Sequence, residues 1–133
     1  MKLIGFIKEH NNIVEARSYD SIKGDNSVTP DIMKKIIRYL NNGELILSWM
    51  GYFIDIDDGN LITPDSYFTD GNYVWPAYFT YYLKKHPKYS IDEFFLEHLH
   101  NCDFLHNESR INKKSKQRLE LELSKKLDES WKK

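Results

Sequence analysis

The sequence is poor in the features that define several large classes of protein. Its 133 residues include one cysteine, Cys102, so an internal disulfide is impossible and a reducing compartment is favoured. No apolar run approaches the roughly 18 residues that a membrane-spanning helix needs. The first ten residues hold only a short apolar stretch broken by Gly5, which predicts a strand and not a signal peptide. We therefore expect a cytoplasmic protein with no membrane association.

Motifs for common catalytic and nucleotide-binding chemistry are also missing. The chain has no Gly-x-Ser-x-Gly elbow, no glycine-rich phosphate loop and no dinucleotide fingerprint. It has no basic stripe with interleaved aromatic residues, which a nucleic-acid-binding surface would require. We expect a protein that is not an enzyme, needs no cofactor and does not bind nucleic acid directly.

What is present is typical of one folded domain. Hydrophobic residues make up 41% and charged residues 29% of the chain, and its length suits a single core. No internal repeat and no linker divides residues 1–133. The sequence therefore predicts a single domain spanning the whole chain.

The N-terminal third predicts two strands and a helix. Residues 3–7 and 13–19 have strand character and are expected to pair across the turn at residues 10–12. Thr29 and Pro30 are typical of a helix start, and Asn41-Asn42-Gly43 predicts its end. This helix would present one apolar stripe to the core.

The rest of the chain predicts a β-meander followed by helices. Asp58-Gly59 and Asp70-Gly71 predict tight turns between strands within residues 45–56, 60–68 and 72–75. Gly51 and Pro64 interrupt these strands and indicate a bulge and an edge. Helical periodicity then returns, with helices expected at residues 77–85, from Ser90 with Glu93 in capping-box spacing, and from about residue 112. The expected fold class is α+β, an antiparallel β-meander packed against about four helices.

Charge is distributed unevenly along the chain. The formal net charge is only −1, but residues 39–83 contain no Lys or Arg and six acidic residues. The same segment carries twelve of the nineteen Phe, Trp and Tyr residues. Roughly half of these rings are expected to pack in the core, because one face of a meander must be buried.

The remaining rings and the carboxylates suit a protein interface. Tyr and Trp supply rigid buried area, and negative charge speeds encounter with a basic partner. We therefore expect an outward-facing acidic and aromatic patch that binds another protein. Its predicted members are Asp55, Asp57, Asp58, Asp65, Tyr67, Asp70 and Tyr73. The plainer interpretation is a solvated hairpin in which the aspartates only form turns.

Two groups of residues raise the possibility of a metal or a catalytic thiol. The run from Asp55 to Asn60 resembles a calcium loop, but its glycine comes one position too early for an EF-hand. His98, Cys102 and His106 recur every four residues and would share one helix face, which could hold zinc or activate the thiol. No metal is expected, and this group is kept as a weak candidate for zinc or for a thiol enzyme.

A family resemblance adds a more specific hypothesis. Tyr39-Leu40 with Gly43, then Asp70-Gly71, Trp75-Pro76 and Tyr81-Tyr82, resembles small immunity proteins of bacterial polymorphic-toxin systems, including contact-dependent growth inhibition. The resemblance covers about residues 30–100 and carries over no catalytic or interface residue. It implies a bacterial cytoplasmic protein that binds and neutralises one cognate toxin domain, often a nuclease and expected to be basic. The alternatives are the metal-dependent or thiol enzyme above and an adaptor with another protein partner.

Overall fold

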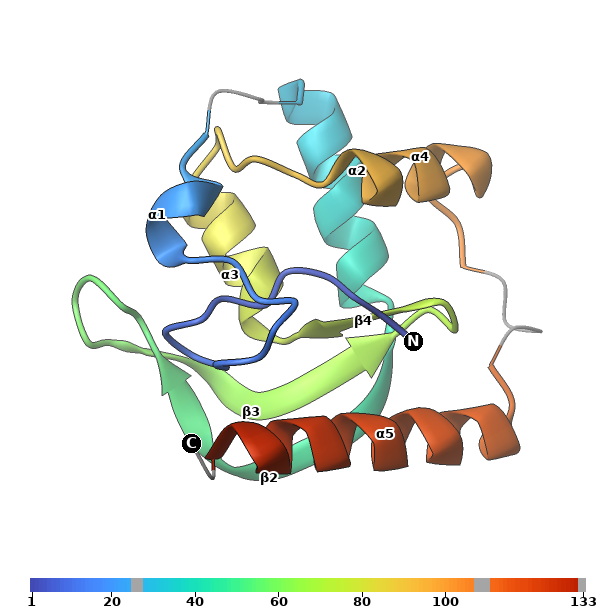
Figure 1. The fold of residues 1–133 in the computed structure, drawn as a ribbon. Coiled ribbons are helices and arrows are strands. Elements are labelled where there is room, and N and C mark those ends of the chain that lie inside the picture. The colour runs from blue at the N-terminus through green and yellow to red at the C-terminus, as the bar shows by residue number, and fades with distance from the viewer. Residues whose placement is uncertain (25–27, 107–110, 132–133) are drawn as a thin grey trace.

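The computed structural model describes residues 1–24, 28–106 and 111–131 and contains a mixed four-stranded sheet (Figure 1). The strands are β1 (Lys2–Leu3), β2 (Glu44–Ile54), β3 (Leu61–Thr69) and β4 (Tyr73–Pro76). Their order across the sheet is β1-β4-β3-β2. The chain forms a single α+β domain, as expected from the sequence.

The first strand differs from the prediction. β2, β3 and β4 form the expected antiparallel meander, but β1 pairs in parallel with β4, Lys2 opposite Tyr73. The sheet is therefore mixed and not wholly antiparallel. The predicted hairpin of residues 3–7 with 13–19 is wrong, since only a single parallel bridge joins Ile7 to Arg17. Gly5 explains this, because its φ of +80° turns the chain out of the strand after β1.

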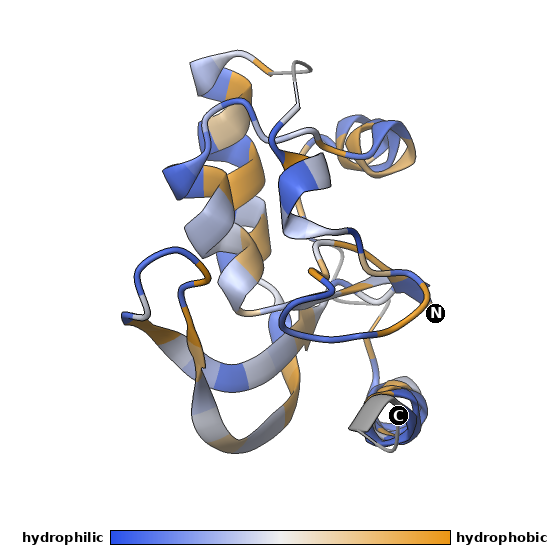
Figure 2. Ribbon diagram, turned by 60° about the vertical axis from the view of Figure 1, so that its left-hand side comes forward, coloured by the Kyte–Doolittle hydropathy of each residue, from blue (hydrophilic) through white to orange (hydrophobic). Residues whose placement is uncertain are grey.

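The β2–β3 hairpin extends well beyond the rest of the sheet. β4 pairs only with residues 67–69 of β3, so the outer part of the hairpin is a ribbon of two strands. The predicted bulge lies at Gly51, where φ is +106° and the register shifts between Ser48 and Tyr52. Pro64 pairs with Tyr52 in this outer part, where β3 has no neighbour on its other side among the described residues. Figure 2 shows the ribbon curving and carrying apolar residues towards its outer turn.

Helices cover both sides of the sheet in Figure 1. The short helix α1, absent from the prediction, lies on the upper side with α2, α3 and α4, and α5 crosses the lower side next to β2. The bounds are α1 (Tyr19–Ile22), α2 (Pro30–Asn41), α3 (Tyr78–Lys85), α4 (Glu93–Asn101) and α5 (Lys113–Trp131). Thr29 caps α2 as predicted, but Asp92 and not Ser90 caps α4.

The core is built largely from aromatic side chains. Phe53 lies edge-on to both Tyr67 and Tyr78, and Tyr78 in turn packs against Tyr82. The largest side chains less than 2% exposed are Trp75, Tyr39, Tyr67, Tyr78, Tyr82, Phe79 and Phe95. Four of these seven are tyrosines, so the core must provide polar partners for their hydroxyl groups.

Two glycines with positive φ allow a matched test of this packing. A Cβ at Gly5 would lie 2.3 Å from Cγ of Phe79, whereas a Cβ at Gly59 would meet nothing within 4 Å. Gly59→Ala should lower the free energy of unfolding by about 1–2 kcal/mol through backbone strain alone. Gly5→Ala should cost roughly 1–3 kcal/mol more, because the buried Phe79 ring must move. Urea denaturation measures both, and equal losses would contradict the packing at Gly5.

Candidate functional site

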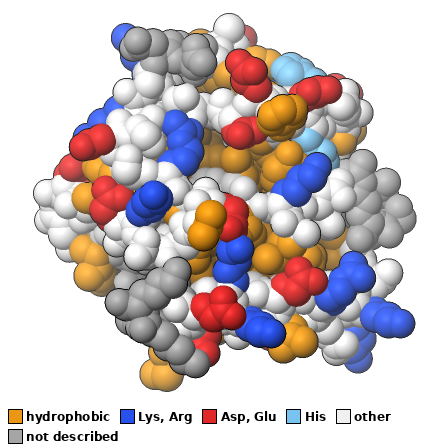
Figure 3. All heavy atoms as spheres, viewed as in Figure 1, with side chains coloured by type: hydrophobic (Ala, Val, Ile, Leu, Met, Phe, Trp, Pro, Cys, Tyr) orange, Lys and Arg blue, Asp and Glu red, His pale blue; other side chains and the backbone are white. Residues whose placement is uncertain are grey.

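The seven residues predicted to bind a partner do not form one surface. Tyr67, Tyr73, Asp55 and Asp70 are buried, with exposed fractions of 1%, 6%, 2% and 1%. The prediction of these four as contact residues is therefore wrong. The rings fill the inner face of the sheet, and the two carboxylates hydrogen-bond within the fold. Figure 3 shows acidic and basic side chains interspersed over one face of the molecule.

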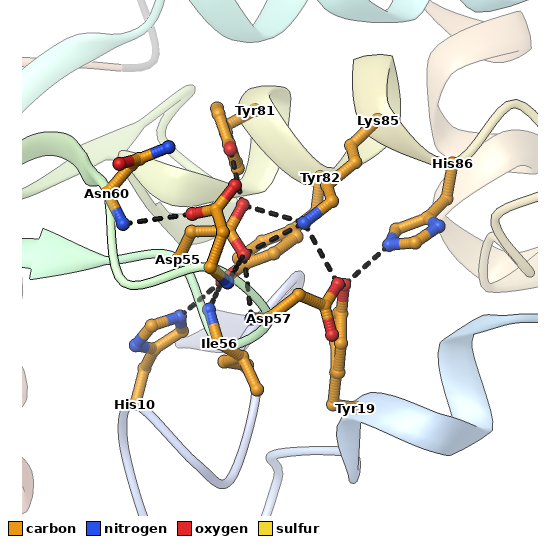
Figure 4. A network of polar contacts seen from close by, with 11 residues as sticks. His10, Tyr19, Asp55, Ile56, Asp57, Asn60, Tyr81, Tyr82, Lys85 and His86 are labelled. Atoms are coloured by element: carbon orange, nitrogen blue, oxygen red, sulfur yellow. Dashed lines mark hydrogen bonds and ion pairs between the residues drawn. The ribbon is translucent and has the colours of Figure 1, made fainter.

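Asp55 lies at the end of the hairpin and joins it to α3 (Figure 4). Its carboxylate accepts hydrogen bonds from Lys85 Nζ at 2.7 and 2.8 Å, from the Tyr81 hydroxyl and from the amide of Asp57. Burial alone would raise the pKa of Asp55, but the hydrogen bonds from Lys85 and Tyr81 hold it well below its usual range. Asp55 is therefore a buried anion that anchors the hairpin.

Asp57 extends this cluster to the N-terminal segment. Its Oδ2 accepts a hydrogen bond from the Tyr19 hydroxyl at 2.6 Å and forms an ion pair with Lys85 Nζ at 2.9 Å. Because Tyr19 donates its only hydroxyl proton to Asp57, its oxygen accepts from His86 Nε2 at 2.7 Å. Asp57 is 46% exposed, yet both of its contacts tie separate parts of the chain together.

His10 and Tyr82 complete the cluster in Figure 4. The Tyr82 oxygen accepts from the amide of Ile56, which leaves its proton for His10 Nε2 at 2.7 Å. Burial lowers the pKa of His10, so the ring is neutral and can accept this proton. Burial also raises the pKa of Tyr82 to about 12. The cluster thus fixes the hairpin and the N-terminal segment to α3.

A second buried cluster surrounds Asp70. Its Oδ2 accepts from the Tyr39 hydroxyl and from His98 Nε2, and its Oδ1 accepts from the amides of Asn72 and Tyr73. Burial would raise the pKa of Asp70, but the bonds from Tyr39 and the amides lower it overall. The Asp70 carboxylate accepts from four donors in all and so holds the β3–β4 turn against α2 and α4.

The zinc candidate is not assembled by the fold. His98 Nε2 binds Asp70, whereas His106 Nε2 lies 2.6 Å from the backbone oxygen of Tyr39 and its ring stacks on that of Tyr39. The Cys102 thiol donates to the Leu99 carbonyl. Within residues 1–24, 28–106 and 111–131, no three His, Cys, Asp or Glu side chains are grouped to hold a metal ion. The four-residue spacing fails because α4 ends at Asn101.

The outer half of the hairpin carries an exposed apolar surface that the sequence analysis did not identify. Met50 is 99% exposed, Leu61 68%, Tyr52 59% and Ile54 49%. Tyr52 is the only exposed ring among the twelve aromatics of residues 39–83. Since paired residues lie on one face of a ladder, Ile54 and its partner Leu61 lie together. We call these four residues the hairpin patch.

A pocket of about 450 Å³ lies beside the hairpin patch, between the hairpin and the N-terminal segment. Its size is within the range of ligand sites. The lining residues are Glu9, His10, Tyr52, Phe53, Ile54, Ile56 and Asp65. The walls are mainly aromatic and aliphatic, and two carboxylates supply its negative charge.

Asp65 is the one carboxylate of the hairpin that the fold leaves incompletely satisfied. Of the buried side-chain nitrogen and oxygen atoms in the described ranges, only its Oδ1 has no hydrogen-bond partner. Burial raises the pKa of Asp65, and a hydrogen bond from Tyr67 offsets this only in part. Its charge therefore costs stability, which is unusual for a side chain without a function.

Several of these residues escaped the sequence analysis. Tyr81 and Lys85 are four residues apart in a helix, so their shared face could have been expected. Tyr19 lies 38 positions before its partner Asp57, and His10 lies 72 positions before its partner Tyr82, and no local pattern marks either contact. The polar cluster therefore depends on tertiary structure.

No protein-family model, no curated protein and no solved structure matches the chain. None of the helices in the described residues has the length and apolar composition needed to cross a membrane.

Removing Lys85 tests the Asp55 anchor. Lys85→Met should lower the free energy of unfolding by about 2–3 kcal/mol, somewhat less than for a fully buried pair because Lys85 is 27% exposed. Lys84→Met, on the exposed side of α3, is the matched control and should change stability by less than about 0.5 kcal/mol. Urea denaturation at pH 7 measures both variants. A Lys85→Met protein as stable as wild type would refute the anchor.

Asp65 gives a prediction with a defined pH dependence. The pKa of Asp65 in the folded protein lies above its ordinary value of 3.8. Between these two pKa values the native state binds more protons than the unfolded state. The contribution of Asp65 to stability is therefore highest below pH 3.8 and is lost as the pH rises through the folded pKa. Asp65→Asn should raise the free energy of unfolding at pH 7 by roughly 1 kcal/mol. Asp58→Asn is the control, and a loss of stability in Asp65→Asn would contradict the assignment.

Proposed function

We propose that this protein acts by binding another protein, and that the hairpin patch is its main contact surface. The observation that carries the proposal is the exposure of Met50, Tyr52, Ile54 and Leu61 together on a two-stranded ribbon. Large apolar side chains gathered on one exposed surface mark interaction sites more often than single exposed ones do. Met and Tyr are also enriched at the centre of protein interfaces.

The edge of the sheet supports the same proposal. β2 is the last strand of the sheet, and in the described part of the chain no strand pairs with its outer side. A long edge strand offers unpaired backbone groups, and partners use such edges by adding a strand. Three of the four residues of the hairpin patch, Met50, Tyr52 and Ile54, belong to this edge strand. A partner that contacts the side chains could therefore also pair with the backbone.

Local charge favours a basic partner. Residues 39–83 contain no Lys or Arg, and Asp58 and Asp65 are carboxylates of the hairpin without an ion pair in the described chain. Glu9 lies at the same end of the molecule, in the pocket next to Tyr52. Two copies of this surface would repel each other, whereas a basic partner would be attracted. Asp57 contributes less, because Lys85 neutralises it.

We propose an immunity-type inhibitor as the specific form of this function. The likeness to immunity proteins of polymorphic-toxin systems supports it, and so does the negative charge of the hairpin, which suits the basic cleft of a nuclease. The partner would be one cognate toxin domain, bound and blocked in the bacterial cytoplasm. No catalytic residue of this chain is required. An adaptor with another protein partner would use the same surface, and the identity of the upstream gene product separates the two.

Charge insertion into the hairpin patch tests the proposal. The double variant Met50→Lys with Leu61→Lys should weaken binding to the toxin domain encoded directly upstream by about tenfold or more. Leu121→Lys, at a residue 72% exposed on α5, is the control and should bind like wild type. Calorimetry with the purified toxin domain measures affinity, and thermal unfolding checks the fold. The proposal is refuted if the upstream product does not bind, or if both variants bind equally well.

A further inference from the structure

The pocket beside the hairpin patch shares two residues with it. Tyr52 and Ile54 belong to both, so a protein seated on the patch covers the mouth of the pocket. The opposite wall comes from Glu9 and His10 of the N-terminal segment. Hydrogen bonds hold this wall in place: the Tyr82 hydroxyl donates to His10 Nε2, and the amide of Tyr19 donates to the Glu9 carboxylate. The pocket is therefore preformed and continuous with the proposed interface.

The lining has the chemistry of a cation site. Glu9 and Asp65 provide two carboxylates, and none of the described residues that line the pocket is Lys or Arg. His10 is the third titratable group, and burial lowers its pKa, so it adds no positive charge at neutral pH. Tyr52 and Phe53 are aromatic residues of the lining, which suits a cation, and Ile54 and Ile56 suit an aliphatic stem. Arg and Lys side chains combine these two features.

The incomplete bonding of Asp65 points in the same direction. Every other buried polar side-chain atom of the described ranges has a partner, but Oδ1 of Asp65 has none. Lys85, the cation of the neighbouring turn cluster, is already paired with Asp55 and Asp57. Oδ1 itself is closed to solvent in the free protein, but Asp65 lines the pocket, and a donor that reaches its carboxylate from there would offset the cost of its burial. A guanidinium group supplies such donors in a planar fork.

We propose that this pocket receives an Arg or Lys side chain of the protein partner, held between Asp65 and Glu9 with its stem against Tyr52 and Ile54. The inference rests on the proposed function, because it takes the occupant to be part of the bound protein. The occupant belongs to a partner and not to a second copy, since another copy would bring the same acidic hairpin to the interface.

The pocket can be tested without the partner. The probe is N-acetyl-arginine N-methylamide, titrated into the full-length isotope-labelled protein at pH 7 and followed by NMR. Its citrulline analogue has nearly the same shape without the charge. We expect saturable shifts at Tyr52, Ile54 and Asp65, with a dissociation constant in the millimolar range, about that of a small ligand worth 4 kcal/mol. The citrulline probe should bind at least about tenfold more weakly, because the charge-assisted bonds are lost.

Three variants locate the site. Asp65→Asn and Glu9→Gln should each weaken the arginine probe by at least about fivefold, since a hydrogen bond to a charged group is replaced by a neutral one. Glu9→Gln keeps an oxygen for the Tyr19 amide, so the pocket wall should stay in place. Asp58→Asn removes a carboxylate of the same hairpin outside the pocket and should bind the probe like wild type. Equal binding of the two probes, or unchanged binding in Asp65→Asn, would overturn the inference.

Two further outcomes separate this inference from the proposed function. If the arginine probe binds in the pocket but the upstream toxin domain does not bind the protein, the cation site is supported and the inhibitor role falls. If the toxin domain binds through the hairpin patch and Asp65→Asn leaves its affinity unchanged, the pocket inference alone falls. A dimer in light scattering that Met50→Lys dissociates would make a second copy the occupant and would overturn the assignment to a partner.

Discussion

The ion pair of Asp55 with Lys85 is the interaction on which the position of the proposed binding surface depends. Among the described residues no third strand pairs with the outer hairpin, so β-pairing alone cannot fix its direction. Asp55 sits at the end of β2 and binds α3 through Lys85 and Tyr81. Asp57 of the same turn accepts a further hydrogen bond from Tyr19 of α1. The hairpin is thus held by Lys85 and Tyr81 of α3 and by Tyr19 of α1.

The acidic residues of segment 39–83 have different roles in the folded protein. The six carboxylates of residues 39–83 look alike in the sequence, but the fold uses them in different ways. Asp55 and Asp70 are buried anions with complete sets of donors, and Asp57 is neutralised by Lys85. Asp65 alone is partly buried and incompletely bonded. Negative charge available to a partner therefore comes from fewer residues than the sequence suggests, and it lies beside apolar side chains.

Local sequence signals predicted much of the fold. The Asp-Gly turns, the bulge at Gly51 and the cap at Thr29 occur where they were expected, because each depends on the conformation of a few neighbouring residues. The parallel pairing of β1 was missed, since it joins residues 2 and 73 and no local pattern encodes such a contact. α4 starts after Asp92 and not after Ser90, because the Asp92 side chain accepts from the amide of Phe95.

The site was less predictable than the fold. Alternation places Tyr67 and Tyr73 inside once the inner face of the sheet is known, but the sequence did not show which face that was. The sequence did not single out Met50, Tyr52, Ile54 and Leu61, which are exposed where β3 extends beyond its pairing with β4. The burial of a strand depends on its neighbours in space, and these are not encoded locally.

A protein partner is proposed to cover the outer hairpin. Hydrogen–deuterium exchange of the full chain, alone and with the toxin domain encoded directly upstream, tests it most directly. We predict slower exchange on binding in residues 48–63 and no change in α5, which contributes no residue to the hairpin patch or to the pocket. Protection confined to α4 or α5, with the hairpin exchanging as fast as in the free protein, would contradict it.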